Sequence, residues 1–307
     1  MSKKWSILLS AFLIVAAVYV FAKNSDKTAP QPKLLVAVPQ SAGSKMVDSR
    51  EVNLPGPPKT KIVIATHGWF EQETWPENLV LSIQNKVDSN QWLCGWLDWR
   101  KEAMFINPRD AAQYARDKAG PLLADDILKL SKNPQHVHLI AHSAGCWAIS
   151  EAAKIIASKT NASIHLTFLD AYVPLAWDPN ELGNIPAGPN TVFWADQYLT
   201  EDITSKVTDY SLKHSHNVDI GEITPGLKDH RFPFYWYPAT VIGKYVPGDK
   251  YDGKVLYYKT DNCEYGFSRS LEAGKSNWQQ SLKLPLGNDA IILQKVTKQP
   301  ANSGEKK

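Results

Sequence analysis

The sequence has little cysteine and no basic run. Only three cysteines, Cys94, Cys146 and Cys263, occur in 307 residues, which is too few for a disulfide framework, and the odd number leaves at least one without an internal partner. Cys94 and Cys146 lie in apolar stretches, so we expect small buried side chains there. The net charge is only +3, and no five consecutive residues are lysine or arginine, which argues against nucleic acid as a partner.

Charged residues are also missing from a stretch near the N-terminus. Lys3 and Lys4 precede the uncharged run "WSILLSAFLIVAAVYVFA", which Lys23 ends. A basic start, an apolar run and the small residue Ala22 are typical of an export signal. The run is longer than a usual signal core and slightly short for a membrane span, so cleavage and retention as a membrane anchor both stay open. We therefore expect an exported protein that is secreted, periplasmic or tethered to a membrane.

The rest of the chain divides by composition. The N-terminal segment 1–22 is followed by a linker rich in lysine, serine and proline over 23–59, which holds one short strand pattern, "LLVAV". A core of alternating strands and helices covers 60–245, and 246–307 forms a small C-terminal extension with a polar tail. No internal repeat is evident.

Strand and helix patterns alternate along the core. Strands are predicted at 61–68, 92–99, 136–141, 163–170 and 190–196, and helices at 77–87, 111–132 and 144–157. Gly120-Pro121 should bend or split the second helix. This alternation predicts an α/β fold, with a mostly parallel sheet covered by helices on both faces.

One junction carries a chemical signature. The segment "HVHLIAHSAGCWAISEAA" changes from strand to helix at Ser143, which Ala141 and Gly145 flank two residues away on each side. A sharp strand-to-helix turn with small flanking residues is a nucleophile elbow, which lifts a serine hydroxyl above the edge of the sheet. Ala141 stands where the usual pattern has glycine. We predict that Ser143 is a nucleophile.

A nucleophilic serine needs a histidine as base, and the histidine needs a carboxylate that orients it. In folds built around a nucleophile elbow, both residues follow the serine in the chain. Four histidines follow, of which His165, His214 and His216 lie in strand-like segments, whereas His230 lies in a turn before an aromatic run. His230 is therefore the predicted base. Two aspartates, Asp170 and Asp196, each end a predicted strand, and physical reasoning alone does not choose between them.

The first central strand ends in "ATHGWF", where Gly68 permits the loop to bend. The amide of Trp69 could then point at the oxyanion, together with the amide of Ala144 after the serine.

These segments resemble the pancreatic lipase-like branch of the α/β-hydrolases. The similarity runs in order through "THGWF", "WLCGWLDWR", "HVHLIAHSAGCWAISEAA", "LTFLDAYVP" and "DHRFPFYWY" and spans roughly residues 60 to 240. The resemblance implies an α/β-hydrolase fold, with Ser143, Asp170 and His230 as the catalytic triad and Trp69 and Ala144 as the oxyanion hole. The family's disulfide-closed lid has no counterpart in "SHNVDIGEITPGLKD", and its C-terminal β-sandwich is missing.

The sequence therefore predicts a serine hydrolase of carboxylic acyl esters, similar to lipases and esterases, that needs no cofactor or metal. Its expected partner is an ester or lipid small molecule, and contact with a membrane surface stays open. An amidase, thioesterase or peptidase could use the same triad, and a non-catalytic binding module on a hydrolase fold is a further alternative.

Overall fold

In the computed structural model of the chain, the described residues are 31–41, 43–54, 58–186, 192–202, 206–254, 259–260, 263–267 and 291–292. The chain divides into two units, residues 1–31 and residues 32–307, and the second carries all the elements below. The predicted export signal and most of the C-terminal extension lie outside the described residues. No helix within the described ranges is long and apolar enough to cross a membrane.

Strands and helices alternate along the second unit. The strands are β1 (Lys33–Gln40), β2 (Gly43–Asp48), β3 (Lys61–Thr66), β4 (Trp92–Asp98), β5 (His136–His142), β6 (Ser163–Leu169), β7 (Phe193–Leu199), β8 (His216–Asp219), β9 (Lys259–Thr260), β10 (Cys263–Glu264) and β11 (Ile291–Ile292). The α-helices are α2 (Trp75–Gln84), α3 (Pro108–Tyr114), α4 (Gly120–Leu130), α5 (Gly145–Lys159) and α6 (Phe232–Ile242).

Nine of the described strands form one sheet in the order β11-β8-β7-β6-β5-β3-β4-β1-β2. Along this order, every pairing from β11 to β4 is parallel, whereas β1 pairs antiparallel with both β2 and β4. Parallel strands place their carboxyl ends at one edge of the sheet, which is where α/β proteins build their sites.

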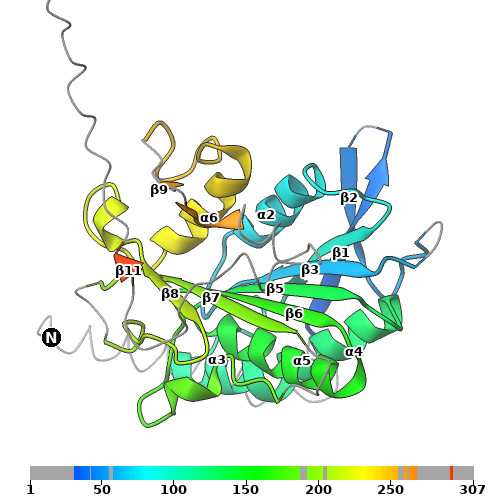
Figure 1. Cartoon of the computed structure of the whole chain (residues 1–307), viewed down its shortest axis with the longest axis horizontal. Helices are drawn as coiled ribbons and strands as arrows, with labels where there is room; N and C mark the ends of the chain where they lie inside the picture. The colour runs from blue at the N-terminus through cyan, green and yellow to red at the C-terminus, as the bar shows by residue number, and fades with distance from the viewer. Residues whose placement is uncertain are drawn as a thin grey trace, which may run out of the picture. The chain divides into compact units, whose positions relative to one another are not determined.

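Helices cover both faces of the sheet, as predicted. Helices α3, α4 and α5 lie on one face, and α2 and α6 lie on the other (Figure 1). The predicted mostly parallel α/β architecture is therefore confirmed. Cys94 and Cys146 are buried in the two cores as free thiols, in agreement with the expectation for apolar positions.

The predicted break in the second helix occurs as a wider turn. A π-helical segment, Ala115–Ala119, joins α3 to α4, so Gly120 and Pro121 begin α4 instead of interrupting a regular helix. A Cβ at Gly120 would lie 2.7 Å from the Ala148 carbonyl oxygen, which shows how closely this turn packs against α5.

The sheet extends further than the sequence patterns suggested. Strands β1 and β2 come from the segment interpreted as a linker, where a single short strand was expected, and β11 comes from the C-terminal extension. Both parts add strands to the sheet edges because each supplies backbone groups that pair with an exposed neighbour.

The face of the sheet under α2 and α6 contains buried polar residues. The rings of His138 and His165 stack with their centroids 4.0 Å apart, and both side chains are almost fully buried. His136, at the start of β5, donates from Nδ1 to the Ser163 hydroxyl at 2.8 Å. Burial, with smaller repulsion from His165 and Lys61, lowers the pKa of His136 to about 3. These histidines are therefore neutral in the folded protein at neutral pH.

We expect His136 to make the protein sensitive to acid. The unfolded chain binds a proton near pH 6.5, whereas folded His136 does so only near pH 3, so the free energy of unfolding falls as pH drops below 6.5. Between pH 5.5 and 4 each such histidine contributes a slope of about 1.4 kcal/mol per pH unit. Urea unfolding measured across this pH range should show that the free energy of unfolding of His136→Gln changes less steeply with pH than that of the wild type. The expected difference in slope is about 1.4 kcal/mol per pH unit.

The half-buried His214 supplies the control. Its pKa is lowered mainly by partial burial, so His214→Gln should change the slope by much less. Equal slopes for the wild type and His136→Gln would show that His136 binds a proton in the folded protein.

Candidate active site

Ser143 lies at the turn between β5, which ends at His142, and α5, which begins at Gly145. Its φ of +54° lies in the left-handed region, which a non-glycine residue adopts only when its surroundings hold it there. Two backbone bonds hold it: the Ser143 amide donates to the Leu169 carbonyl at 3.0 Å, and its carbonyl accepts from the Cys146 amide at 3.1 Å.

Neighbouring backbone crowds this turn closely. A Cβ at Gly145 would lie 2.2 Å from the His67 carbonyl oxygen, and a Cβ at Gly68 would lie 2.7 Å from the Ser143 Cβ. The two glycines are therefore needed for the "HG" loop to lie directly against the serine turn. Ala141, at the position where the usual pattern has glycine, is fully buried in the α5-side core, so its methyl is accommodated.

Asp170 immediately follows β6 and is fully buried, also with a positive φ, of +50°. Its Oδ2 accepts from His230 Nδ1 at 2.7 Å, and its Oδ1 accepts from the Thr200 amide at 2.9 Å. The Thr200 hydroxyl adds a longer bond of 3.3 Å to Oδ2. These donors orient the carboxylate toward the imidazole.

The electrostatics of this pair fit an ionised aspartate beside a basic histidine. Burial raises the pKa of Asp170 to about 6, and the His230 hydrogen bond opposes part of that rise, so the carboxyl is ionised at pH 7. Burial lowers the pKa of His230, but the hydrogen bond and charge of Asp170 outweigh it and the net pKa is raised.

His230 lies beside the serine turn, just before α6. Its ring centroid is 4.5 Å from that of His142, the residue before Ser143. His142 Nε2 donates to the His230 carbonyl oxygen at 3.0 Å, and the His142 ring packs edge-on against Trp75 and Phe234. The structure thus brings His230, Asp170 and the turn that holds Ser143 together.

Asp196 occupies a different environment. It lies in the middle of β7, three residues beyond the strand's start, and not at its carboxyl end as the sequence pattern suggested. Its Oδ1 accepts from the Thr167 hydroxyl at 2.6 Å and lies 3.2 Å from His165 Nε2, and its Oδ2 accepts from Tyr198 at 3.1 Å. The register of β7 therefore places Asp196 within the buried polar face of the sheet, away from the edge that carries Asp170.

The loop after β3 is held by His67. The Trp99 amide donates to His67 Nε2 at 3.0 Å, so Nδ1 carries the proton and donates to the Gly68 carbonyl at 2.9 Å. Burial is the main cause that lowers the pKa of His67 to about 4, so the ring stays neutral and can fill both roles. Trp69 is further fixed by its indole N–H, which donates to the Phe105 carbonyl at 2.9 Å.

Three side chains near the serine turn could offer ligand atoms to a metal ion. Donor atoms of Asp170, Asp202 and His230 lie within 4.8 Å of one another. Asp170 already uses both oxygens as acceptors for Thr200 and His230, and this hydrogen bonding explains its position without an ion.

Sequence reasoning missed His142 and Thr200, and it gave His67 no role. His142 fixes the His230 backbone, and Thr200 supports the Asp170 carboxylate. Position alone could have suggested His142, because it precedes the serine. Thr200 has no sequence signal, since its contact depends on the pairing of β6 with β7.

Comparison with known proteins gives only distant similarities. No family profile and no curated protein matches the chain. Among solved structures, a dienelactone hydrolase-like promiscuous phosphotriesterase from metagenomic libraries shows 11% identity and a TM-score of 0.32, covering 58% of this chain and 72% of its own. A poly(3-hydroxybutyrate) depolymerase from Bordetella parapertussis shows 10% identity and a TM-score of 0.30, covering 49% and 58%. A hyperthermophilic esterase from the archaeon Pyrobaculum calidifontis shows 12% identity and a TM-score of 0.32, covering 87% and 85%.

The sheet order and the serine turn are those of the α/β-hydrolase fold, so the predicted fold class is confirmed. The narrower resemblance to the pancreatic lipase-like branch stays a prediction.

We expect Gly145→Ala to destabilise the protein by about 3 kcal/mol or more, because the added methyl would overlap a backbone carbonyl that cannot rotate away. Ala144→Gly makes a change of the same size at the adjacent position and should cost about 1 kcal/mol or less. Urea unfolding of both variants measures the difference. Similar losses would mean that the loop after β3 can move away from α5.

Proposed function

We propose that the protein is a serine hydrolase that cleaves carboxylic acyl esters. The observation that carries this proposal is the 2.7 Å hydrogen bond from His230 to the buried Asp170, beside a serine held at φ +54°. A buried carboxylate that orients a histidine next to a strained serine is the arrangement that acyl transfer requires.

In the proposed reaction, Ser143 Oγ attacks the ester carbonyl carbon while His230 Nε2 takes the hydroxyl proton. Nε2 is the nitrogen available for this step, because Nδ1 donates to Asp170. His230 then gives the proton to the leaving alcohol, and an acyl-enzyme forms. Water, deprotonated by His230, attacks the acyl-enzyme, and the proton returns to Ser143 as the carboxylic acid leaves.

The amides of Trp69 and Ala144 are the proposed donors to the oxyanion. Ala144 is the first residue after the serine, and Trp69 follows Gly68, whose backbone packs against Ser143. Removal of one oxyanion donor typically costs about 3 kcal/mol of transition-state stabilisation. The His67 hydrogen bonds support this role, because they fix the loop before substrate binds.

Exposed apolar side chains around the site favour an ester with an apolar acyl group. Trp69 and Phe70 are exposed in the loop after β3, and Met104 and Ile106 are exposed in a neighbouring loop. Hydrogen bonds from the Trp69 indole and the Phe70 amide join the first loop to the second. Leu227, 81% exposed, lies three residues before His230. Exposed apolar side chains in these loops suit substrates that are largely hydrocarbon.

Covalent labelling tests the proposal directly. A fluorophosphonate probe should label Ser143 with loss of fluoride, and Ser143→Ala should lose both labelling and hydrolysis of p-nitrophenyl butyrate. Ser158→Ala, at an exposed position on α5, is the matched control and should behave as wild type. Undiminished turnover by a folded Ser143→Ala protein would contradict the proposal.

The two aspartates should respond differently to loss of charge. Asp170→Asn should lower kcat by about 10⁴-fold, because the amide would favour the wrong imidazole tautomer. Asp196→Asn should keep turnover within about tenfold and lose about 1–3 kcal/mol of stability through its buried hydrogen bonds. Ester hydrolysis and urea unfolding of both variants check this, and the reverse pattern would move the proposed acid to β7.

A further inference from the structure

A second carboxylate lies close to the proposed base. Asp202 comes three residues after β7 and is buried, with 6% of its surface exposed. One of its carboxylate oxygens lies within 4.8 Å of a carboxylate oxygen of Asp170 and of a ring nitrogen of His230. Because Asp170 follows β6, which pairs with β7, the two acids reach the imidazole from neighbouring strand ends. Asp196 was the aspartate expected at the end of β7, and Asp202 is the one that the structure places beyond it.

Hydrogen bonds fix the segment that carries Asp202. The Thr200 amide and hydroxyl donate to Asp170, and the Asp202 amide donates to the Asp209 carboxylate. Burial, followed by the charge of Asp202, raises the pKa of Asp209, whereas the charge of Lys228 lowers it. Asp202 is therefore held near the proposed base by contacts on both sides of it along the chain.

Asp202 can act on the imidazole of His230 through its charge. Nδ1 donates its proton to Asp170 at 2.7 Å, and Nε2 is needed for the serine hydroxyl. Neither nitrogen therefore has a further proton to donate to Asp202. A negative charge this close still favours the protonated ring where water is partly excluded.

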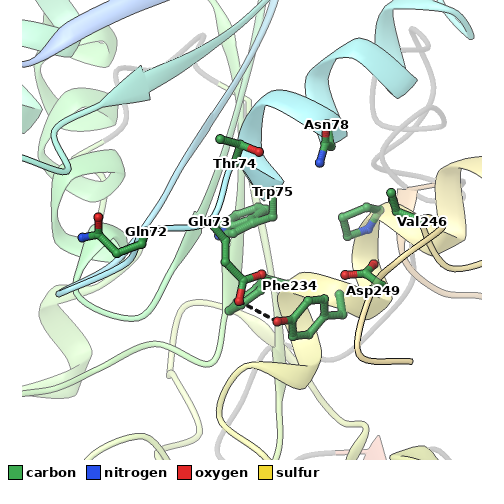
Figure 2. A pocket seen from close by; sticks show the side chains of 10 residues that line it. Gln72, Glu73, Thr74, Trp75, Asn78, Phe234, Val246 and Asp249 are labelled. Carbon is green, nitrogen blue, oxygen red and sulfur yellow. Dashed lines mark hydrogen bonds between the residues drawn. The ribbon is translucent and has the colours of Figure 1, made fainter. Parts of the chain in front are cut away.

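The other charged groups around the proposed base are balanced by their neighbours. Asp229 pairs with Lys250, and its Oδ1 lies 3.7 Å from Arg231 Nε. Arg231 Nη1 lies 3.9 Å from Glu73, which also accepts from the Tyr235 hydroxyl at 2.7 Å (Figure 2). Together these groups add little net charge beside the imidazole.

The pKa of His230 reflects this arrangement. Burial lowers the pKa, and the hydrogen bond and charge of Asp170 raise it. The charge of Asp202 raises the pKa further, and does so by more than the charge of Asp229. The His142 ring, which packs against that of His230, is neutral because burial lowers its pKa, so it adds no positive charge.

We infer that Asp202 is a positioning residue for the proposed hydrolysis, acting through His230 by stabilising the imidazolium that forms when Ser143 gives up its proton. The proton still moves from Ser143 Oγ to His230 Nε2 and then to the leaving alcohol, and Asp202 stays ionised throughout. The inference rests on the proposed function, because the imidazolium forms only if His230 acts as the base.

The pH dependence of p-nitrophenyl butyrate hydrolysis tests the inference. In Asp202→Asn, the acidic limb of kcat/KM should move down by about one pH unit, because loss of the negative charge lowers the pKa of His230. The plateau should fall about tenfold, because the imidazolium is then less stable. EDTA in every assay removes any metal ion that the carboxylates could bind.

Two further variants separate charge from structure. Glu201→Gln removes the same charge from the exposed neighbouring position, where water and salt screen it, and should leave the limb within about 0.2 pH units. Asp202→Glu keeps the charge and should bring the limb back to its wild-type position. A lower plateau without a shifted limb in Asp202→Asn, or an equal shift in Glu201→Gln, would overturn the inference.

NMR titration of the histidines separates this inference from the proposed function. The His230 resonance is the one missing from His230→Gln, and its pKa should fall by about one unit in Asp202→Asn whether or not the protein turns over an ester. An unchanged His230 pKa in the folded variant would overturn the inference, whereas absence of labelling at Ser143 would contradict the proposed function. If thermal unfolding shows that Asp202→Asn is not folded, Asp202→Ser, which also removes the charge, replaces it with the same expectation.

Discussion

The candidate active site depends on one close contact, between the loop after β3 and the first residue of α5. A Cβ at Gly145 would lie 2.2 Å from the His67 carbonyl, so the chain can turn from β5 into α5 at this point only with glycine there. The turn places Ser143 at a positive φ, and Gly68 permits the neighbouring loop to pack against it. The position of the proposed nucleophile and the position of a proposed oxyanion donor are therefore fixed by the same contact.

Neutral histidines hold this arrangement from two sides. His67 bridges the loop after β3 to the Trp99 backbone, and His142 holds the backbone of His230. Burial keeps the pKa of both rings below its usual value. A neutral imidazole offers one donor and one acceptor at fixed positions, whereas a charged one would repel the proposed base. His230 differs from both because its partner is the carboxylate of Asp170, which raises its pKa.

The acidic groups near α2 and α6 are of two kinds, fully buried and partly exposed. Asp170 and Asp196 are fully buried and accept hydrogen bonds from several donors. Asp249 is half-buried beside Glu73, and no ion pair forms at its carboxylate within the part of the chain that is described. A buried acid with full hydrogen bonding is explained by the fold, and the partly exposed Glu73 pairs with Tyr235 and Arg231.

The sequence by itself determined the features that depend on short segments. Alternating strand and helix patterns gave the parallel α/β sheet, and the small residues around Ser143 gave the strand-to-helix turn. Chain order and a turn-like setting indicated His230 as the base. The ends of two predicted strands indicated Asp170 and Asp196 as the candidates for the orienting carboxylate. The tertiary structure decided what depends on register and on distant pairing. It placed Asp170 directly after β6, beside His230, whereas β7 continues for three residues beyond Asp196. Three residues along a strand span about 10 Å, so Asp196 lies that far from the carboxyl end of its strand. It also added β1, β2 and β11 to the sheet and packed the start of α2 against α6, segments more than 150 residues apart, and no local pattern encodes these contacts.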